Sequence, residues 1–419
     1  MRGRAALAVV LAVALVVRLA LVAEVSPRYH PAFDAADYDR HAHSIAIGHG
    51  YPDSVRVRGQ PTAFRPPGYP YLLATVYKTT GKRWSAGLVL AALLGTLIVL
   101  LLYVLAEWAF DRRVALVAAA LAAVFPPLVA LSASLLSEPL FVLIELGLVV
   151  AVLGYRRTSR IWPWALAAGA LAGLGALTRA NGLLLVIPAA IGVWTARPLL
   201  SRRALAAPAA VVVVALLAVV PWTVRNAVVM HHFLPGTTQT GFALAGAYDD
   251  ESRTDRETPA RWHNPAGTRE YRPLYLKRGI DEVELDSQLR SKAVDYIGDH
   301  PGYVPKALWW NTLRVFDLAA SNRDDARGLR RERGLTVTED RIARFGGYAG
   351  LALALVGLVL LLRMPRGRRG PAFMWLVPPL MVVGAMFILG NARYRAPLDP
   401  FIVLLAAIAL ARLTPRPAR

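Results

Sequence analysis

The chain has 419 residues, of which 56% are hydrophobic, and its mean hydropathy is +0.42. Because the apolar residues come in uninterrupted runs of about 20, the length of a bilayer-spanning helix, an ordinary soluble enzyme, a disordered chain and a fibrous protein are excluded. The absence of cysteine excludes disulfide frameworks, thiol nucleophiles and cysteine-ligated zinc or iron. The net charge of +20 would suit nucleic-acid binding, but the positions of the charges argue against that interpretation.

Ten apolar runs predict an all-α polytopic membrane protein with about ten transmembrane helices. The first run follows Arg2 and Arg4 and is longer than the apolar core of a signal peptide, so we expect it to be retained as a helix. The expected spans cover about 5–23, 85–106, 113–131, 138–154, 162–178, 182–196, 204–222, 347–362, 371–390 and 397–411.

The loops between these spans predict that both termini are cytoplasmic. With the N-terminus inside, the cytoplasmic segments hold 17 Lys and Arg residues against 2 Asp and Glu, whereas the two long exterior segments hold 27 against 23. An excess of Lys and Arg is typical of cytoplasmic loops, where it faces an anionic leaflet. Topology therefore explains most of the net charge, and we predict a multi-pass plasma-membrane protein that binds no nucleic acid.

The spans divide the chain into five regions. Two exterior segments are long enough to be functional, and the second combines helical periodicity over 280–297 with an amphipathic stretch that suits the membrane interface. The regions are a first transmembrane helix at 1–23, a first exterior loop at 24–84, transmembrane helices two to seven at 85–222, a large exterior loop at 223–346, and transmembrane helices eight to ten with a cytoplasmic tail at 347–419.

Charged residues are rare in the spans, where they are costly and mark functional sites. A carboxylate and four arginines fall at or near exterior ends of spans and are expected to converge: Glu138, Arg179, Arg225, Arg393 and Arg395. Snorkelling to lipid phosphates explains any single arginine equally well, but a polar cavity explains the set better. Glu145 lies two turns from Glu138 and is expected either to extend this cavity or to pair with Arg18.

The first exterior loop carries the most informative pattern. Asp34, Asp37, Tyr38 and His41 share one face of an expected helix at three-to-four spacing, with Asp34 near its start. A carboxylate there suits the helix dipole. On this pattern alone, however, an N-cap is the more common role for the aspartate.

A second pattern in this loop is Arg65-Pro66-Pro67-Gly68-Tyr69-Pro70. The prolines keep Arg65 out of a helix and fix a turn. An arginine on a rigid turn beside the membrane suits bidentate phosphate binding. The alternative is a capped start of the next helix.

These loop motifs resemble the first loop of C-type membrane glycosyltransferases, in particular the protein O-mannosyltransferases and lipid A aminoarabinose transferases of glycosyltransferase family 39. Later motifs agree in order along nearly the whole chain: Ser137-Glu138-Pro139, Leu177-Thr178-Arg179, Pro221-Trp222-Thr223-Val224-Arg225-Asn226 and Arg393-Tyr394-Arg395-Ala396-Pro397. The resemblance implies the C-type fold, in which two large exterior loops carry interfacial helices.

The resemblance also implies roles for particular residues. Asp34 matches the catalytic aspartate, and Glu138 matches a second acidic position at the cavity. Arg65 and Arg179 match basic positions near the lipid phosphate. We add three arginines as candidates for donor binding and three residues for the cavity or the acceptor: Arg225, Arg393 and Arg395, and Asp37, Tyr38 and Tyr69.

The implied donor is a monosaccharide on a polyprenyl phosphate, and the implied acceptor is a hydroxyl of a protein, a polysaccharide or a lipid. A single carboxylate opposite the leaving group predicts an inverting transferase. Two alternatives stay open. A transporter or flippase for a phosphate-bearing lipid or sugar would place its polar residues near the midplane. A non-catalytic membrane assembly protein of envelope biogenesis would tolerate loss of Asp34.

No cofactor is expected, although a divalent metal is left open. Asp37 and Asp39 are two residues apart and do not face each other on a helix, and the histidines lack the spacing typical of zinc ligands. Ala35 stands where the family often has Glu, and Phe64 stands where the aminoarabinose branch has an acidic residue that can bind metal. Both departures argue against a structural zinc.

Overall fold

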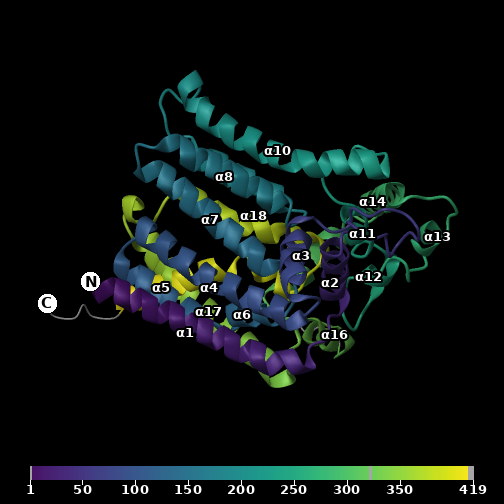
Figure 1. The fold of residues 1–419 in the computed structure, drawn as a ribbon, viewed down its shortest axis with the longest axis horizontal. Helices are drawn as coiled ribbons and strands as arrows, with labels where there is room; N and C mark the ends of the chain where they lie inside the picture. The colour runs from purple at the N-terminus through teal and green to yellow at the C-terminus, as the bar shows by residue number, and fades with distance from the viewer. Residues whose placement is uncertain (1, 320–322, 414–419) are drawn as a thin grey trace.

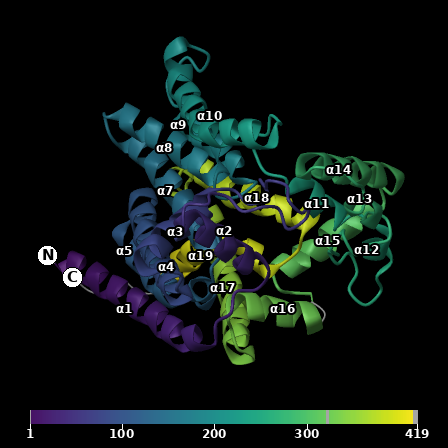
Figure 2. The ribbon, with the colours of Figure 1, turned by 45° about the vertical axis from the view of Figure 1, so that its right-hand side comes forward.

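The computed structural model describes residues 2–319 and 323–413, and the regular elements in these residues are all helices (Figure 1). Long helices form a bundle, and shorter helices from the two long segments cover one end of it, here called the loop end. Helix α1 begins at the opposite end, and α19 finishes there too (Figures 1 and 2). The predicted fold class, an all-α polytopic membrane protein, is confirmed.

The bundle contains every expected span as a helix or as adjoining helices. Within the described residues, five helices are long and apolar enough to cross a membrane, and α5 with α6 forms a bent sixth candidate. Three further apolar segments are shorter: Ile161–Ala176, Gly182–Val193 and Ala372–Ile388. The number ten stays a prediction. The bundle helices are α1 (Arg2–Val25), α4 (Trp84–Ala109), α5 (Arg112–Val124), α6 (Pro126–Ala130), α7 (Glu138–Arg157), α8 (Ile161–Ala176), α9 (Val186–Val193), α10 (Arg202–Met230), α17 (Val337–Arg363), α18 (Ala372–Ile388) and α19 (Asp399–Leu413).

The loop end is built from both long segments. The amphipathic periodicity over 280–297 corresponds to α14, whose N-cap Asp281 accepts a hydrogen bond from the Glu284 N–H. The helices here are α2 (Phe33–Ala46), α3 (Gly68–Thr80), α11 (Thr240–Ala245), α12 (Asp250–Thr254), α13 (Arg272–Tyr275), α14 (Glu282–Asp299), α15 (Tyr303–Val315) and α16 (Arg323–Arg333). Five short 3₁₀ turns complete the structure: η1 (Ser26–Arg28), η2 (Leu131–Ala133), η3 (Gly182–Leu185), η4 (Arg366–Arg368) and η5 (Ala392–Arg395).

Two helices extend beyond the expected spans. Helix α10 continues past the expected end at 222 to Met230, so Arg225 lies within the helix instead of just outside it. Helix α17 begins at Val337, ten residues before the expected span, because Thr336 and Glu339 form a capping box. Hydropathy detects the apolar part of such helices and misses the polar turns that continue them.

Arg18 stabilises the break between α5 and α6. Pro126 interrupts this pair, whose axes differ by 52°. Fully buried Arg18 donates to the carbonyls of Ala123 at 2.9 Å and Ala122 at 3.1 Å, near the end of α5. These carbonyls have no water to bond inside a bilayer. The expected alternative pairing of Arg18 with Glu145 is not found, and both Glu145 carboxylate oxygens are buried without a hydrogen-bond partner among the described residues.

Candidate active site

Asp34 lies in the first turn of α2, and the N-cap interpretation is wrong. The N-cap is Ala32, and it makes no side-chain capping bond. Phe33 has a φ of +50°, in the left-handed region that strains a residue with a side chain. Strain of this kind tends to cluster at functional sites. The Asp34 carboxylate is therefore free to contact residues from other parts of the chain.

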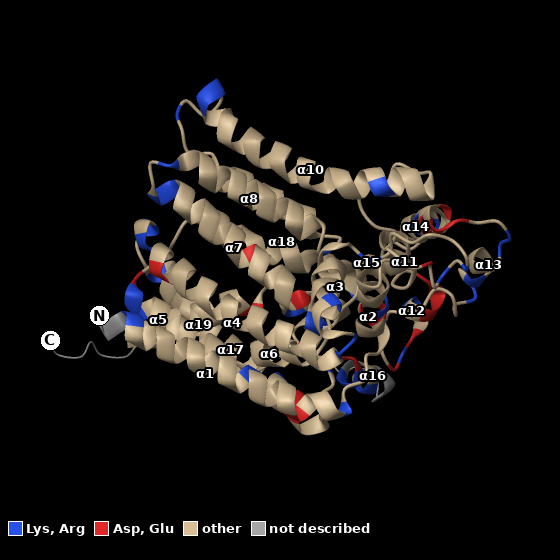
Figure 3. Ribbon diagram, viewed as in Figure 1, with Lys and Arg blue, Asp and Glu red and all other residues tan. Residues whose placement is uncertain are grey.

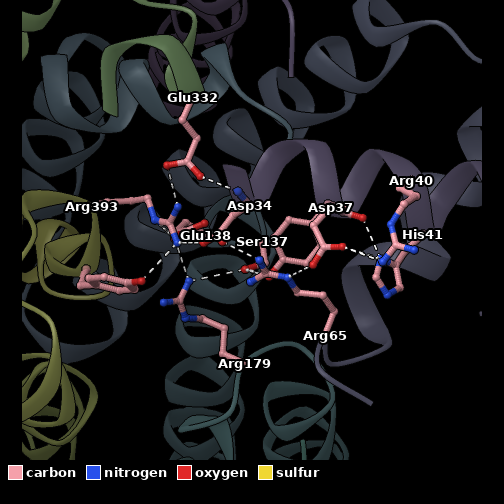
Figure 4. Close-up of polar contacts among 12 residues, drawn as sticks. Asp34, Asp37, Arg40, His41, Arg65, Ser137, Glu138, Arg179, Glu332 and Arg393 are labelled. Atoms are coloured by element: carbon pink, nitrogen blue, oxygen red, sulfur yellow. Dashed lines mark hydrogen bonds and ion pairs between the residues drawn. The ribbon is translucent and has the colours of Figure 1, made fainter. Parts of the chain in front are cut away.

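Two arginines hold the Asp34 carboxylate (Figure 4). Arg65 Nη2 lies 2.5 Å from one oxygen, and Arg393 Nη2 lies 2.6 Å from the other. Burial would raise the pKa of Asp34, but Arg65 and Arg393 outweigh burial and hold this pKa well below the usual range. Asp34 is therefore ionised at neutral pH.

Arg393 joins three carboxylates at the loop end. It is presented by η5, between α18 and α19, and its side chain is 7% exposed. Besides Asp34, its guanidinium contacts Glu138 at 2.8 Å and Glu332 at 2.9 Å. Glu138 also contacts Arg179 at 2.8 Å. Three residues that the sequence predicts to converge, Glu138, Arg179 and Arg393, thus lie in one network, and Asp34 of the first exterior loop joins them.

Asp37 fixes the orientation of Arg65. Arg65 Nε donates to Asp37 at 2.7 Å, so the guanidinium bridges the two aspartates of α2. Burial would raise the pKa of Asp37, but contacts with His41 and Arg65 lower it. The expected shared face of α2 is confirmed by these contacts.

Gly68 explains why the turn after Arg65 takes its shape. The Gly68 N–H donates to the carbonyl of Leu177 at 2.6 Å, which joins the start of α3 to the end of α8. A Cβ at Gly68 would lie 2.8 Å from that same oxygen, so only glycine allows this approach. The contact places the Arg65 turn beside the segment that carries Arg179.

Glu282 fixes the other side of the Arg65 turn. Its buried carboxylate accepts hydrogen bonds from Thr62 Oγ1 at 2.9 Å, Ala63 N at 3.0 Å and Thr238 Oγ1 at 2.6 Å. The second long segment thereby positions the residues that precede Arg65.

Tyr38 and Tyr69 pack beside this network. The Tyr38 hydroxyl donates to Ser137 Oγ at 3.1 Å, next to Glu138, and the two tyrosine rings meet edge to face. The Tyr69 hydroxyl is buried without a hydrogen-bond partner among the described residues.

Two predicted arginines lie outside the network. Arg225 donates to the Thr62 carbonyl at 2.8 Å and packs over Trp222. Arg395 forms an ion pair with Asp399 at 2.8 Å, one helical turn along the chain. Both are engaged locally, so neither contacts Asp34. Arg395 lines a small polar cavity next to Arg393.

Glu332 belongs to the site and was not predicted. It accepts a hydrogen bond from the Asp34 backbone N–H at 3.0 Å as well as contacting Arg393. Burial raises its pKa, the charge of Arg393 opposes that rise, and Asp34 adds to it. Its place in a charge-dense stretch gives no local signal that distinguishes it from neighbouring solvated charges. Across the described residues, no group of three or more His, Cys, Asp or Glu is placed to hold a metal ion.

Comparisons with known proteins agree with the sequence resemblance. Residues 64–224 match the model of the dolichyl-phosphate-mannose-protein mannosyltransferase family. That range includes Arg65, Glu138, Arg179 and Arg225. No protein of curated function matches the sequence.

Solved structures of an oligosaccharyltransferase share the fold of this chain. The oligosaccharyltransferase AglB of Archaeoglobus fulgidus, in complex with an inhibitory peptide and a dolichol-phosphate, is 16% identical with a TM-score of 0.53, covering 97% of this chain and 50% of that one. Its apo form is 15% identical with a TM-score of 0.52, covering 97% and 50%. ArnT of Cupriavidus metallidurans bound to undecaprenyl phosphate is 15% identical with a TM-score of 0.45, covering 97% and 77%.

The present chain spans about half the length of the oligosaccharyltransferase. At these identities the likeness shows the fold alone. The predicted resemblance to C-type membrane glycosyltransferases is confirmed, and the protein is a multi-pass membrane protein with their fold.

Proposed function

We propose that this protein is an inverting glycosyltransferase that moves a monosaccharide from a polyprenyl phosphate to a hydroxyl acceptor. The observation that carries the proposal is the Asp34 carboxylate, held ionised between Arg65 and Arg393 at the loop end of a C-type fold. Such a site pairs a base for the acceptor with cations for the leaving phosphate.

The reaction needs little acid catalysis from the protein. The acceptor oxygen forms a bond to the anomeric carbon, the bond from that carbon to the phosphate oxygen breaks, and its electron pair leaves with the phosphate. A phosphate leaving group needs no strong general acid. The acceptor proton passes to Asp34 late in the reaction, as suits a weak base. Attack opposite the leaving group inverts the anomeric configuration.

The arginines serve the leaving group and also control Asp34. Arg65 and Arg393 bind Asp34 directly, so an arriving phosphate competes with the carboxylate for the same guanidiniums. When either guanidinium turns from Asp34 to the phosphate, it stabilises the negative charge that develops on the phosphate oxygens. It also removes a cation from Asp34 and makes this carboxylate a better base. Arg179 is held nearby by Glu138 and supplies further positive charge.

The relatives support the proposed donor class. The matching family is named for a dolichyl-phosphate-mannose donor, and AglB was solved with a dolichol-phosphate. We therefore assign a polyprenyl-phosphate-linked hexose or pentose as donor and a protein, polysaccharide or lipid as acceptor. Arg225 and Arg395 remain candidates for contacting the donor outside the Asp34 network.

The charge distribution supports an exterior active site in the plasma membrane. At the bundle end where α1 begins, Lys and Arg outnumber Asp and Glu, whereas most Asp and Glu lie at the loop end, mixed there with Lys and Arg (Figure 3). The first pattern is typical of a cytoplasmic face. We accordingly assign 24–84 and 223–346 to the exterior, and both termini to the cytoplasm.

The transporter alternative receives less support. Its strongest feature is the broken pair α5 and α6, since broken helices often bind transported substrates. Here Arg18 occupies carbonyls at the break, and the ion-pair network lies at the loop end of the bundle. The polar groups at the break therefore already have a partner from the protein.

A direct test is transfer by the purified protein in liposomes that contain radiolabelled polyprenyl-phosphate sugars. We expect transfer, or slow release of the sugar to water, and a product whose anomeric configuration is opposite to that of the donor. Nuclear magnetic resonance of the product reads this configuration. Retained configuration contradicts the single-base mechanism, and no turnover with any donor and acceptor contradicts the proposed activity.

A further inference from the structure

One guanidinium beside the site has no carboxylate partner. Arg56 lies in the loop between α2 and α3, and no described residue forms an ion pair or a hydrogen bond with its guanidinium. Its Nε atom is buried and unpaired. Arg65, Arg179 and Arg393 differ, because each contacts at least one carboxylate.

Two aromatic rings hold the Arg56 side chain. Its guanidinium packs against the ring of Phe64 and lies 4.5 Å from the ring centroid of Phe242. The two rings meet edge to face at 5.5 Å. Phe242 comes from α11, so both long segments contribute to this clamp. Ring contacts attract a cation without neutralising its charge.

The backbone that carries Arg56 is also constrained. Ser54 Oγ accepts hydrogen bonds from the N–H groups of Arg56 at 3.1 Å and Val57 at 3.2 Å. The Ser54 N–H in turn donates to the Gln60 carbonyl at 2.7 Å. A side chain already held in place loses little conformational entropy when a ligand binds.

Arg56 is adjacent to the proposed reaction centre. Arg65 packs on the same Phe64 ring, 4.9 Å from its centroid. Burial lowers the pKa of Arg56 to about 10, the charge of Arg65 lowers this pKa further, and the nearby charges of Glu282 and Asp37 act against both. These carboxylates do not contact the guanidinium, so the remaining cost of burying this cation falls when an anion binds directly beside it.

We propose that Arg56 binds the phosphate of the lipid-linked donor. The inference rests on the proposed function and adds a residue to its donor site. Arg65 is already bound to Asp34 and Asp37, whereas Arg56 can bind a phosphate without breaking an ion pair. In this scheme Arg56 captures the phosphate first, and the phosphate then competes with Asp34 for Arg65.

The test measures lipid binding, which needs no turnover. The full-length protein in nanodiscs is titrated with undecaprenyl phosphate and, separately, with undecaprenol, which lacks the phosphate. Variants are Arg56→Gln, the matched control Arg58→Gln at an exposed position of the same loop, and Phe242→Leu, which keeps the charge and removes one side of the clamp. Thermal unfolding confirms that each variant is folded.

We expect Arg56→Gln to weaken undecaprenyl phosphate binding about tenfold, the effect of one charge-assisted hydrogen bond. We expect a smaller loss for Phe242→Leu, no loss for Arg58→Gln, and unchanged undecaprenol binding throughout. Unchanged phosphate-lipid binding by Arg56→Gln overturns the proposal. Equal loss of both lipids, no preference of the wild type for the phosphate, or full displacement by inorganic phosphate at equal concentration also overturns it.

These outcomes are separable from failure of the proposed function. Arg56-dependent lipid binding without sugar transfer leaves the phosphate site standing and removes the transferase activity. Transfer that depends on Asp34 but is accompanied by normal lipid binding in Arg56→Gln removes only the phosphate site.

Discussion

Replacing Glu332 with Gln tests how the network around Asp34 works. Glu332 accepts from Arg393 at 2.9 Å and from the Asp34 backbone N–H at 3.0 Å, and its side chain is 4% exposed. The substitution keeps the shape and removes the charge. One carboxamide oxygen cannot reproduce both bonds, and its NH₂ group faces a guanidinium. Arg393 then binds Asp34 and Glu138 more tightly.

The expected magnitude follows from the bond that is lost. A hydrogen bond to a charged group contributes about 1.5–3 kcal/mol. If about half of this acts on the transition state, the barrier rises by about 1 kcal/mol and kcat/KM falls about fivefold. Steady-state transfer in liposomes measures the effect. Glu24→Gln, the same change at an exposed residue, is the control and should retain wild-type activity.

The pH profile distinguishes the charge of Glu332 from a loss of structure. The pKa of Glu332 is raised and that of Asp34 is lowered. If activity falls on the acid side of the pH profile with a midpoint above the ordinary glutamate pKa of about 4.3, we assign that fall to Glu332. We expect this fall in the wild type and not in Glu332→Gln. Because the folded-state pKa is the higher one, this group stabilises the fold at low pH, and that contribution is lost as pH rises through the folded pKa. Equal activity of the wild type and Glu332→Gln, or the same fall of activity at acid pH in both proteins, refutes the reasoning.

Three further predictions concern the scaffold. Arg18→Met should lower the free energy of unfolding by about 3 kcal/mol, because the buried carbonyls at the break between α5 and α6 lose their charged donor. Unchanged thermal unfolding in detergent contradicts a stabilising role of Arg18. Gly357→Ala should destabilise the crossing of α17 and α19 by about 2 kcal/mol or more, since a Cβ would overlap the Leu405 carbonyl oxygen and push the two helix backbones apart. Gly384→Ala, which meets nothing within 4 Å, should be neutral in the same unfolding assay. Glu282→Gln should lower transfer about tenfold while overall stability changes little, by loosening the turn before Arg65; wild-type transfer contradicts this positioning role.

Features with a local sequence signal were predicted well. The shared face of α2 and the turn at Arg65 follow from helical spacing and from proline sterics. The convergence of Glu138, Arg179 and Arg393 follows from the cost of charge at the ends of apolar spans, together with an assumed topology.

Features that depend on distant partners were not predicted. Glu332 contacts Asp34 across 298 residues of chain, and nothing in its own neighbourhood distinguishes it from surface charge. Arg225 and Arg395 carry the same signal as Arg393, yet nearby groups engage both of them. Asp34 was open to interpretation as an N-cap because its sequence position suits both roles. Only the backbone at Ala32 and Phe33 decides between them.

Transfer by Asp34→Asn tests the central claim most directly. The variant is compared with the wild type and with Asp53→Asn, a matched change at an exposed residue of the same loop, in liposomes with a radiolabelled polyprenyl-phosphate sugar. We predict that Asp34→Asn loses transfer about 10³-fold, the contribution of a general base, while it still binds the lipid phosphate and Asp53→Asn remains active. Transfer by Asp34→Asn at the wild-type rate would contradict the assignment of Asp34 as the catalytic base.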